Sequence, residues 1–224
     1  MSWAMGPASV QTTGELPRTR RLRVLRKAVF GDWNPYLRDP LDLLRLSFAA
    51  AAVIFLLAGS LEYAVRMAGT FLLVAAAQRL RIPRLFDLLF IVGMGLQAWG
   101  NAGRLFEDID WWDNLVHFVV PATSVPVLYV LNWRLGVLPG MAEEQNPRQR
   151  VGLVLFAIMS GLSIAALYEV YEYVAVNWLG VGLAIGYSDT IFDLALGFGG
   201  AIAGGLLLML WSAEHWATER QPRA

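Results

Sequence analysis

The feature that most constrains this chain is a series of apolar segments, each about as long as a bilayer is thick. Six such segments can be drawn, over residues 42–61, 63–79, 85–103, 111–132, 151–176 and 189–212. A helix needs about 20 mainly apolar residues to cross the hydrocarbon core, and fewer when flanking side chains reach the interface. Arg66 interrupts the second segment, and we expect its side chain to extend toward the interface. The sequence therefore predicts an all-α, polytopic membrane helix bundle with about six transmembrane helices.

Composition supports this class and excludes several functions. Hydrophobic residues make up 57% of the chain and charged residues 16%, whereas a soluble domain has roughly 25% charged residues. The net charge is zero, which argues against nucleic acid as a partner. The chain contains no cysteine, so disulfides, zinc–thiolate sites, iron–sulfur clusters and cysteine nucleophiles are excluded.

The distribution of basic residues predicts the orientation in the membrane. Fifteen Lys and Arg residues fall on one side of the six segments and two, Arg66 and Arg104, on the other, while Arg45 lies at the inner end of the first segment. The positive-inside rule places the basic side, and with it both termini, in the cytoplasm. We therefore expect a basic cytoplasmic tail over residues 1–40, a membrane domain over 41–212 and a cytoplasmic tail over 213–224.

Ionisable residues inside the last three apolar segments mark a candidate site. They form three short motifs, Asp113-Asn-Leu-Val-His117, Glu169-x-x-Glu172 and Asp189-x-x-x-Asp193. Burying a charged residue in hydrocarbon costs about 2.5–3.5 kcal/mol even on insertion scales, so such residues usually mark function. In the predicted topology all of them lie near the extracytoplasmic surface, and their spacings put each pair on one helix face. We expect them to share one polar pocket.

Helix capping is the alternative interpretation of these residues. Asp113 and Asp189 fall in the first turns of their predicted helices, where capping and the helix dipole stabilise a carboxylate without any function. His117 and Asp193 lie a full turn deeper, so capping does not account for them. Glu169 and Glu172 approach the C-terminus of their predicted helix, where the dipole disfavours negative charge.

Five carboxylates and one imidazole in one pocket cannot all be charged without compensation. Either a cation neutralises them, or protons are shared and the set does acid–base chemistry. Oxygen ligands suit Mg²⁺, Ca²⁺ or Mn²⁺, whereas a single His and no Cys make a zinc site a poorer fit. The candidate catalytic residues are Asp113, His117, Glu169 and Glu172, and the candidate ligands of a divalent cation such as Mg²⁺ or Ca²⁺ are Glu169, Glu172, Asp189 and Asp193.

The motif order D-N-x-x-H-F, Y-E-x-x-E, then D-T-x-x-D before a glycine-rich segment resembles the YjdF family of bacterial inner-membrane proteins. The similarity covers roughly residues 40–212. It extends more distantly to the VanZ-like family, with D-x-x-x-H, E-x-x-Q and D-x-x-x-N-x-x-G. Glu172 stands where VanZ-like proteins have Gln, and Gly197 where they commonly have Asn, so the YjdF type is favoured. VanZ-like proteins are linked to teicoplanin resistance, so the resemblance implies a role in the cell envelope and no particular reaction.

The leading hypothesis is a protein of the bacterial inner membrane that binds, or does chemistry on, a lipid or lipid-linked envelope precursor. His117 would act as general base or ligand, oriented by Asp113. A cation or proton-coupled transporter is the rival, and a non-catalytic envelope assembly factor is the third possibility. A transporter needs polar or broken-helix positions in the inner half as well, and Pro121 and Pro126 could break their helix. The glycines of segment 189–212, with Gly200-x-x-x-Gly204, predict close helix packing. The oligomeric state stays open.

Overall fold

The structure of the chain is a computed structural model that describes residues 40–80, 82–138, 147–179 and 186–213. The described residues form helices and turns and contain no strand, which confirms the all-α class. The helices are α2 (Pro40–Leu57), α3 (Leu61–Arg79), α4 (Arg84–Ala102), α5 (Leu105–Asp108), α6 (Trp112–Arg134), α7 (Pro147–Leu179) and α8 (Tyr187–Ala213). The predicted cytoplasmic tails lie outside the described residues, except for Pro40 and Ala213 at their edges.

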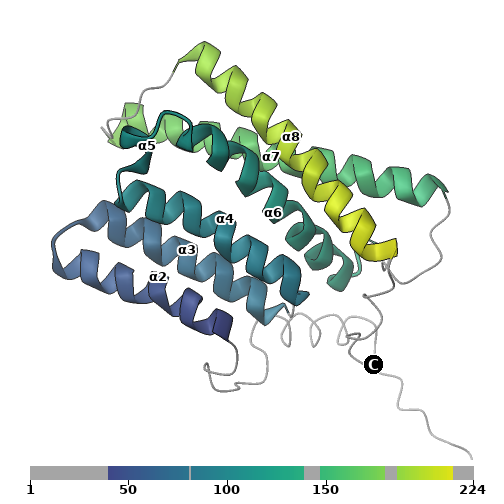
Figure 1. Cartoon of the computed structure of the whole chain (residues 1–224), viewed down its shortest axis with the longest axis horizontal. Coiled ribbons are helices and arrows are strands. Elements are labelled where there is room, and N and C mark those ends of the chain that lie inside the picture. The colour runs from purple at the N-terminus through teal and green to yellow at the C-terminus, as the bar shows by residue number, and fades with distance from the viewer. Residues whose placement is uncertain (1–39, 81, 139–146, 180–185, 214–224) are drawn as a thin grey trace, which may run out of the picture.

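The long helices pack as two groups of three (Figure 1). Helices α2, α3 and α4 lie side by side in chain order, with α3 in contact with both neighbours. In the second group α8 packs against α6 and α7, and the contact between α6 and α8 is the most extensive in the described structure. The contact between α4 and α6 joins the two groups.

The long helices alternate in direction. Residues 197–204 of α8 lie against residues 117–122 of α6 in the same order, so these two helices are parallel, whereas residues 157–165 of α7 meet α8 in reverse order. The described chain begins and ends at the same end of the bundle (Figure 1). We call the end where α6 and α8 begin the site end, and the end where α2 begins the opposite end.

Five of the long helices, α2, α4, α6, α7 and α8, are long and apolar enough to cross a membrane, which supports a polytopic membrane bundle. Helix α3 is not among them, and it contains Glu62, Arg66 and Arg79. It still has 19 residues, and Gln78 near its end donates a hydrogen bond to Asp42 near the start of α2 (2.6 Å). Helix α3 is thus antiparallel to α2 over its length, and this packing favours the sixth span, which stays a prediction.

The structure moves several predicted boundaries, most of all at the end of α2. This helix ends at Leu57 instead of residue 61, because Gly59 adopts the left-handed conformation (φ 77°). The Ser60 N–H donates to the Phe55 carbonyl (2.9 Å) and the Gly59 N–H to the Leu56 carbonyl (3.1 Å), the two bonds of a Schellman cap. Helix α7 is longer than the predicted 151–176, since it runs over Pro147–Leu179.

Glycines allow α6 and α8 to approach closely, as the sequence predicted. Gly200 and Gly204 lie so near the Phe118 and Ala122 carbonyls that an added Cβ would clash with them. Pro126 has no N–H for the Ala122 carbonyl four residues before it, and that carbonyl faces Gly204. Helix α6 nevertheless continues through both of its prolines, so the broken helix that a transporter could use is not seen.

Candidate functional site

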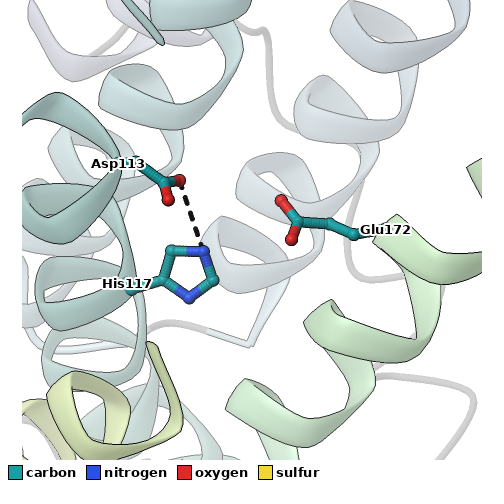
Figure 2. Close-up of side chains that lie close together, drawn as sticks. All are labelled: Asp113, His117 and Glu172. Atoms are coloured by element: carbon teal, nitrogen blue, oxygen red, sulfur yellow. Dashed lines mark ion pairs between the residues drawn. The ribbon is translucent and has the colours of Figure 1, made fainter. Parts of the chain in front are cut away.

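The three predicted motifs meet at the site end of the second helix group. Asp113 and His117 belong to the first two turns of α6, Glu169 and Glu172 to the last part of α7, and Asp189 and Asp193 to the first two turns of α8. Figure 2 shows Asp113, His117 and Glu172 turned toward one another from α6 and α7. The structure therefore brings all six predicted site residues into one cluster.

His117 lies at the centre of the cluster. Its residue is 3% exposed, and its ring is edge-on to the ring of Tyr168, with centroids 4.9 Å apart. The imidazole Nε2 is 3.4 Å from Asp113 Oδ1, the contact dashed in Figure 2, and Nδ1 is 3.6 Å from Glu169 Oε1. Each ring nitrogen thus faces one carboxylate, from α6 on one side and from α7 on the other.

The ligand atoms group into three overlapping trios. In each trio, one N or O atom from each residue lies within 4.8 Å of the other two. Two trios contain the imidazole, and the third consists of carboxylates alone. The trios are Asp113–His117–Glu172, His117–Glu169–Asp193 and Asp113–Asp189–Asp193. The sequence had assigned Asp113 to catalysis rather than to a cation, whereas in the structure it completes the set that contains only oxygen.

Several polar atoms of the cluster are buried without a hydrogen-bond partner. They are His117 Nε2, Glu169 Oε1 and Asp193 Oδ2. The contact from His117 Nε2 to Asp113 is therefore a close electrostatic approach and not a hydrogen bond. Asp193 is 2% exposed, so a carboxylate is buried within a helix that is long and apolar enough to cross a membrane. Unpaired buried polar groups are costly and usually indicate strain, a missing ligand or a functional role.

Helix capping does not explain why Asp113 lies at the start of α6. The N-cap position of this helix is occupied by Trp111, and no side chain donates or accepts a capping hydrogen bond there. Asp113 lies in the first turn, where the dipole stabilises its charge by about 0.3–1 kcal/mol. That effect falls off within the first turn, so it leaves His117 and Asp193 unexplained, as the sequence predicted.

A hydrogen-bond chain from α4 supports the imidazole, and the sequence did not single out its central residue. Gln97 Nε2 donates to the Tyr168 hydroxyl (2.6 Å), and Asn101 Nδ2 donates to Gln97 Oε1 (2.9 Å). Tyr168 in turn packs edge-on against His117. A Gln inside an apolar segment, one helix turn before Asn101, was the available signal.

Arg66 of α3 approaches the same region from the first helix group. It donates to Glu62 (2.7 Å), one turn nearer the site end, as an interface-directed side chain should. Its side chain is only 13% exposed, however, because its guanidinium carbon lies 5.5 Å from the centre of the Tyr171 ring. The Tyr171 ring is 5.9 Å from that of Tyr168, so aromatic rings connect Arg66 with the imidazole.

Two cavities adjoin the cluster. A small one, of about 10 Å³, lies beside His117 and is lined by residues of α6 and α7, including Tyr168. That volume is close to the minimum for one water molecule. The larger one, of about 190 Å³, is lined by Glu169, Tyr173, Gly186, Tyr187 and Thr190. Glu169 thus belongs both to the wall of the larger cavity and to the surroundings of the imidazole.

A second polar cluster, at the opposite end, was not predicted. Arg45 of α2 donates to Asp42 (2.6 Å) and to Asp87 of α4, and Gln78 of α3 donates to Asp42 (2.6 Å). Arg45 and Asp42 are each 3% exposed. The sequence placed Arg45 at the end of a span and gave the two aspartates no role. Their positions in the first turns of α2 and α4 were the available signal.

Comparisons with known proteins identify the family. A family model described as "Predicted membrane protein (DUF2238)" matches residues 43–214. No curated protein and no solved structure matches the chain. The family match is consistent with the YjdF-type resemblance, and the more distant VanZ-like resemblance stays a prediction.

The matched stretch contains all six site residues and all the long helices except the first residues of α2. Its description as a membrane protein agrees with the five helices able to cross a membrane, which would sit in a lipid bilayer. Because the match covers residues 43–214 of 224, the chain belongs to the DUF2238 family of predicted membrane proteins.

Proposed function

We propose that the protein lies in the bacterial inner membrane and that its cluster of acidic residues and His117 binds, and does chemistry on, a lipid or lipid-linked envelope precursor. The observation that carries this proposal is the burial of His117 and Asp193 with unpartnered polar atoms in helices of membrane-spanning length. Ionisable residues at such positions are costly for folding and are by default functional.

The arrangement around the imidazole suits proton transfer. Asp113 contacts Nε2 and would orient the ring, which leaves Nδ1 facing Glu169. A neutral imidazole can accept a proton on one nitrogen while a carboxylate stabilises the charge through the other. Glu169 lines the 190 Å³ cavity, so a proton taken from a group in that cavity could pass to His117 by way of this carboxylate.

The position of the cluster suggests where the substrate comes from. All six residues lie at the site end, which the distribution of basic residues predicts to face away from the cytoplasm. Tyr173 and Tyr187 line the larger cavity and are exposed, as aromatic side chains at a membrane interface commonly are. A head group in the outer leaflet could therefore enter the cavity from the bilayer, with its acyl chains remaining among the lipids.

A transporter is less well supported. Between the two polar clusters, the buried residues of α6 are largely apolar, including Val120, Val125 and Val130. Thr123, which is also buried, donates to the Val119 carbonyl of its own helix (2.9 Å). The cluster at the opposite end joins α2, α3 and α4, not the three helices of the site. The described residues thus show no continuous polar path from one end to the other.

Complementation tests the proposal. In a host whose own family member has been deleted, His117→Ala should fail to restore the envelope phenotype, while its amount in the membrane equals that of the wild type. Glu107→Gln is the matched control, because Glu107 is an exposed carboxylate near the site end that pairs with Arg104 outside the cluster. Full complementation by His117→Ala would exclude acid–base chemistry at this residue and favour an assembly factor.

A further inference from the structure

We infer that the trio Asp113, Asp189 and Asp193 is a binding site for Ca²⁺ or a similar oxygen-preferring divalent cation, held between the first two turns of α6 and of α8. The inference rests on the proposed function, because the cation would serve the same site. It differs from the ligand set expected from the sequence, in which Glu169 and Glu172 replaced Asp113.

The three carboxylates lie close enough together to share one ion. One carboxylate oxygen from each residue lies within 4.8 Å of the other two. One oxygen-preferring cation could therefore contact all three carboxylates, and water reaching the exposed Asp189 could complete its coordination shell.

The burial of Asp193 leaves one of its carboxylate oxygens without a protein partner. Asp193 is 2% exposed, and its Oδ2 has no hydrogen-bond partner, although it is one of three carboxylates gathered at this point. Helix dipoles stabilise a carboxylate in a first turn by only about 0.3–1 kcal/mol, and Asp193 lies a turn deeper. A divalent cation would provide both the missing partner and the opposite charge.

The close approach of α6 and α8 brings carboxylates of the two helices together. Gly200 and Gly204 allow backbone contact with α6, and the two parallel helices bring Asp113 and Asp193 together at their starts. Unless a cation or shared protons neutralise them, these like charges repel each other across the most extensive helix contact of the described structure. With a cation bound between the carboxylates of α6 and α8, the same helix contact instead keeps the ligands in place for binding.

The two trios that contain His117 are less suited to the cation. Each of them contributes an imidazole nitrogen, which suits zinc or copper better than a hard cation. A cation in the oxygen trio would leave His117 beside it, with Nε2 3.4 Å from the ligand Asp113, free to act on protons.

Cation binding to the purified full-length protein in lipid nanodiscs tests the inference directly. Calorimetric titration with Ca²⁺ should show one site in the wild type, and Asp189→Asn should weaken binding about tenfold or more. Asp189 is exposed, so this substitution leaves the packed interior intact, and Glu107→Gln is the control that should bind as the wild type does. Absence of Ca²⁺ binding, or equal binding by Asp189→Asn, would overturn the inference.

Mn²⁺ gives a second, independent measurement. Pulsed EPR of bound Mn²⁺ should show no coupling to a nitrogen nucleus, because all three protein ligands are oxygens. A nitrogen coupling that His117→Gln removes would place the cation on the imidazole and refute the oxygen trio. Neither experiment requires the substrate, so a negative result would refute the cation site alone. The proposed function is tested separately, by complementation with His117→Ala.

Discussion

At the scale of single residues, Glu169 is the side chain whose position is hardest to explain by stability. It lies in the last part of α7, its Oε1 is buried without a hydrogen-bond partner, and Glu172 follows one turn later. The neighbouring carboxylate disfavours its negative charge. The helix dipole, which the sequence suggested as a second cause, does not reach Glu169, because α7 continues ten residues beyond it to Leu179. Its contacts instead serve the site, because it faces His117 and lines the larger cavity.

Glu169→Gln should therefore separate function from stability. We expect the thermal unfolding temperature in detergent to rise or stay unchanged, because the amide keeps the volume and removes the unfavourable charge. Complementation of the envelope phenotype should be lost. A sharp fall in the unfolding temperature, with function retained by the molecules that survive, would show that the carboxylate is structural.

Tyr168 should act on the site through its position. Its ring packs against His117, and its hydroxyl accepts the hydrogen bond from Gln97. Tyr168→Phe keeps the ring and removes that bond, so we expect partial complementation and a shift of the imidazole NMR resonances. Gln97→Glu, which retains an acceptor for Asn101 but changes the group facing the hydroxyl, is the comparison. Unchanged resonances in both variants would remove Tyr168 from the positioning of His117.

At the scale of helices, two contacts hold the bundle in different ways. At the contact of α6 with α8, glycines allow the backbones to touch. Between α2 and α4, a buried arginine is shared by two aspartates. Backbone proximity gives packing energy without charge, whereas buried ion pairs bring specificity at a desolvation cost.

Gly204→Ala tests the first contact. The added Cβ would meet the Ala122 carbonyl, which cannot move without bending α6, so we expect a loss of about 1–3 kcal/mol in the free energy of unfolding. Gly69→Ala is the control, because nothing lies within 4 Å of its Cβ position and alanine favours a helix by about 0.5–1 kcal/mol. Titration with a denaturing detergent measures both. Equal stability of the two variants would mean that the helices are not in contact at Gly204.

Arg45→Met tests the second contact. It would leave Asp42 and Asp87 buried without the guanidinium that both now contact, so we expect a loss of about 3–5 kcal/mol. Adding Asp42→Asn and Asp87→Asn should restore much of that loss, since the charges are then removed together. If the triple variant is no more stable than Arg45→Met alone, packing rather than charge explains the effect.

At the scale of the whole molecule, the alternating direction of the helices determines on which side of the membrane the two chain ends and the site residues lie. The described chain begins at Pro40 and ends at Ala213 at the same end of the bundle, as an even number of crossings requires. The sequence predicts that this end faces the cytoplasm, from the excess of basic residues on that side. The six site residues lie at the other end.

Reporter fusions test the topology. A reporter joined after Ala224 should be active only in the cytoplasm, and one inserted between residues 180 and 186 only outside it. A reporter placed in the turn between α2 and α3, at Gly59, should behave like the insertion if α3 is a true span. Periplasmic activity of the fusion after Ala224 would reverse the orientation, and the site would then face the inner leaflet.

The sequence by itself determined the membrane class, the helical content and the residues of the candidate site. These follow from local properties: the length of each apolar segment, and the cost of charges such as Asp193 and Glu169 inside it. It also indicated that the motifs would meet, because successive spans alternate in direction and so bring the end of one helix beside the start of the next.

Only the tertiary structure decided which side chains face one another. It placed Asp113 with Asp189 and Asp193, set Glu169 against His117, and revealed Gln97 and the buried cluster around Arg45. These pairings depend on how each helix is rotated and how closely it approaches its neighbours. Contacts such as that of Gly204 with the Ala122 carbonyl determine the rotation and the separation of the helices. The two residues of such a contact lie in different segments of the sequence, so neither segment alone predicts it.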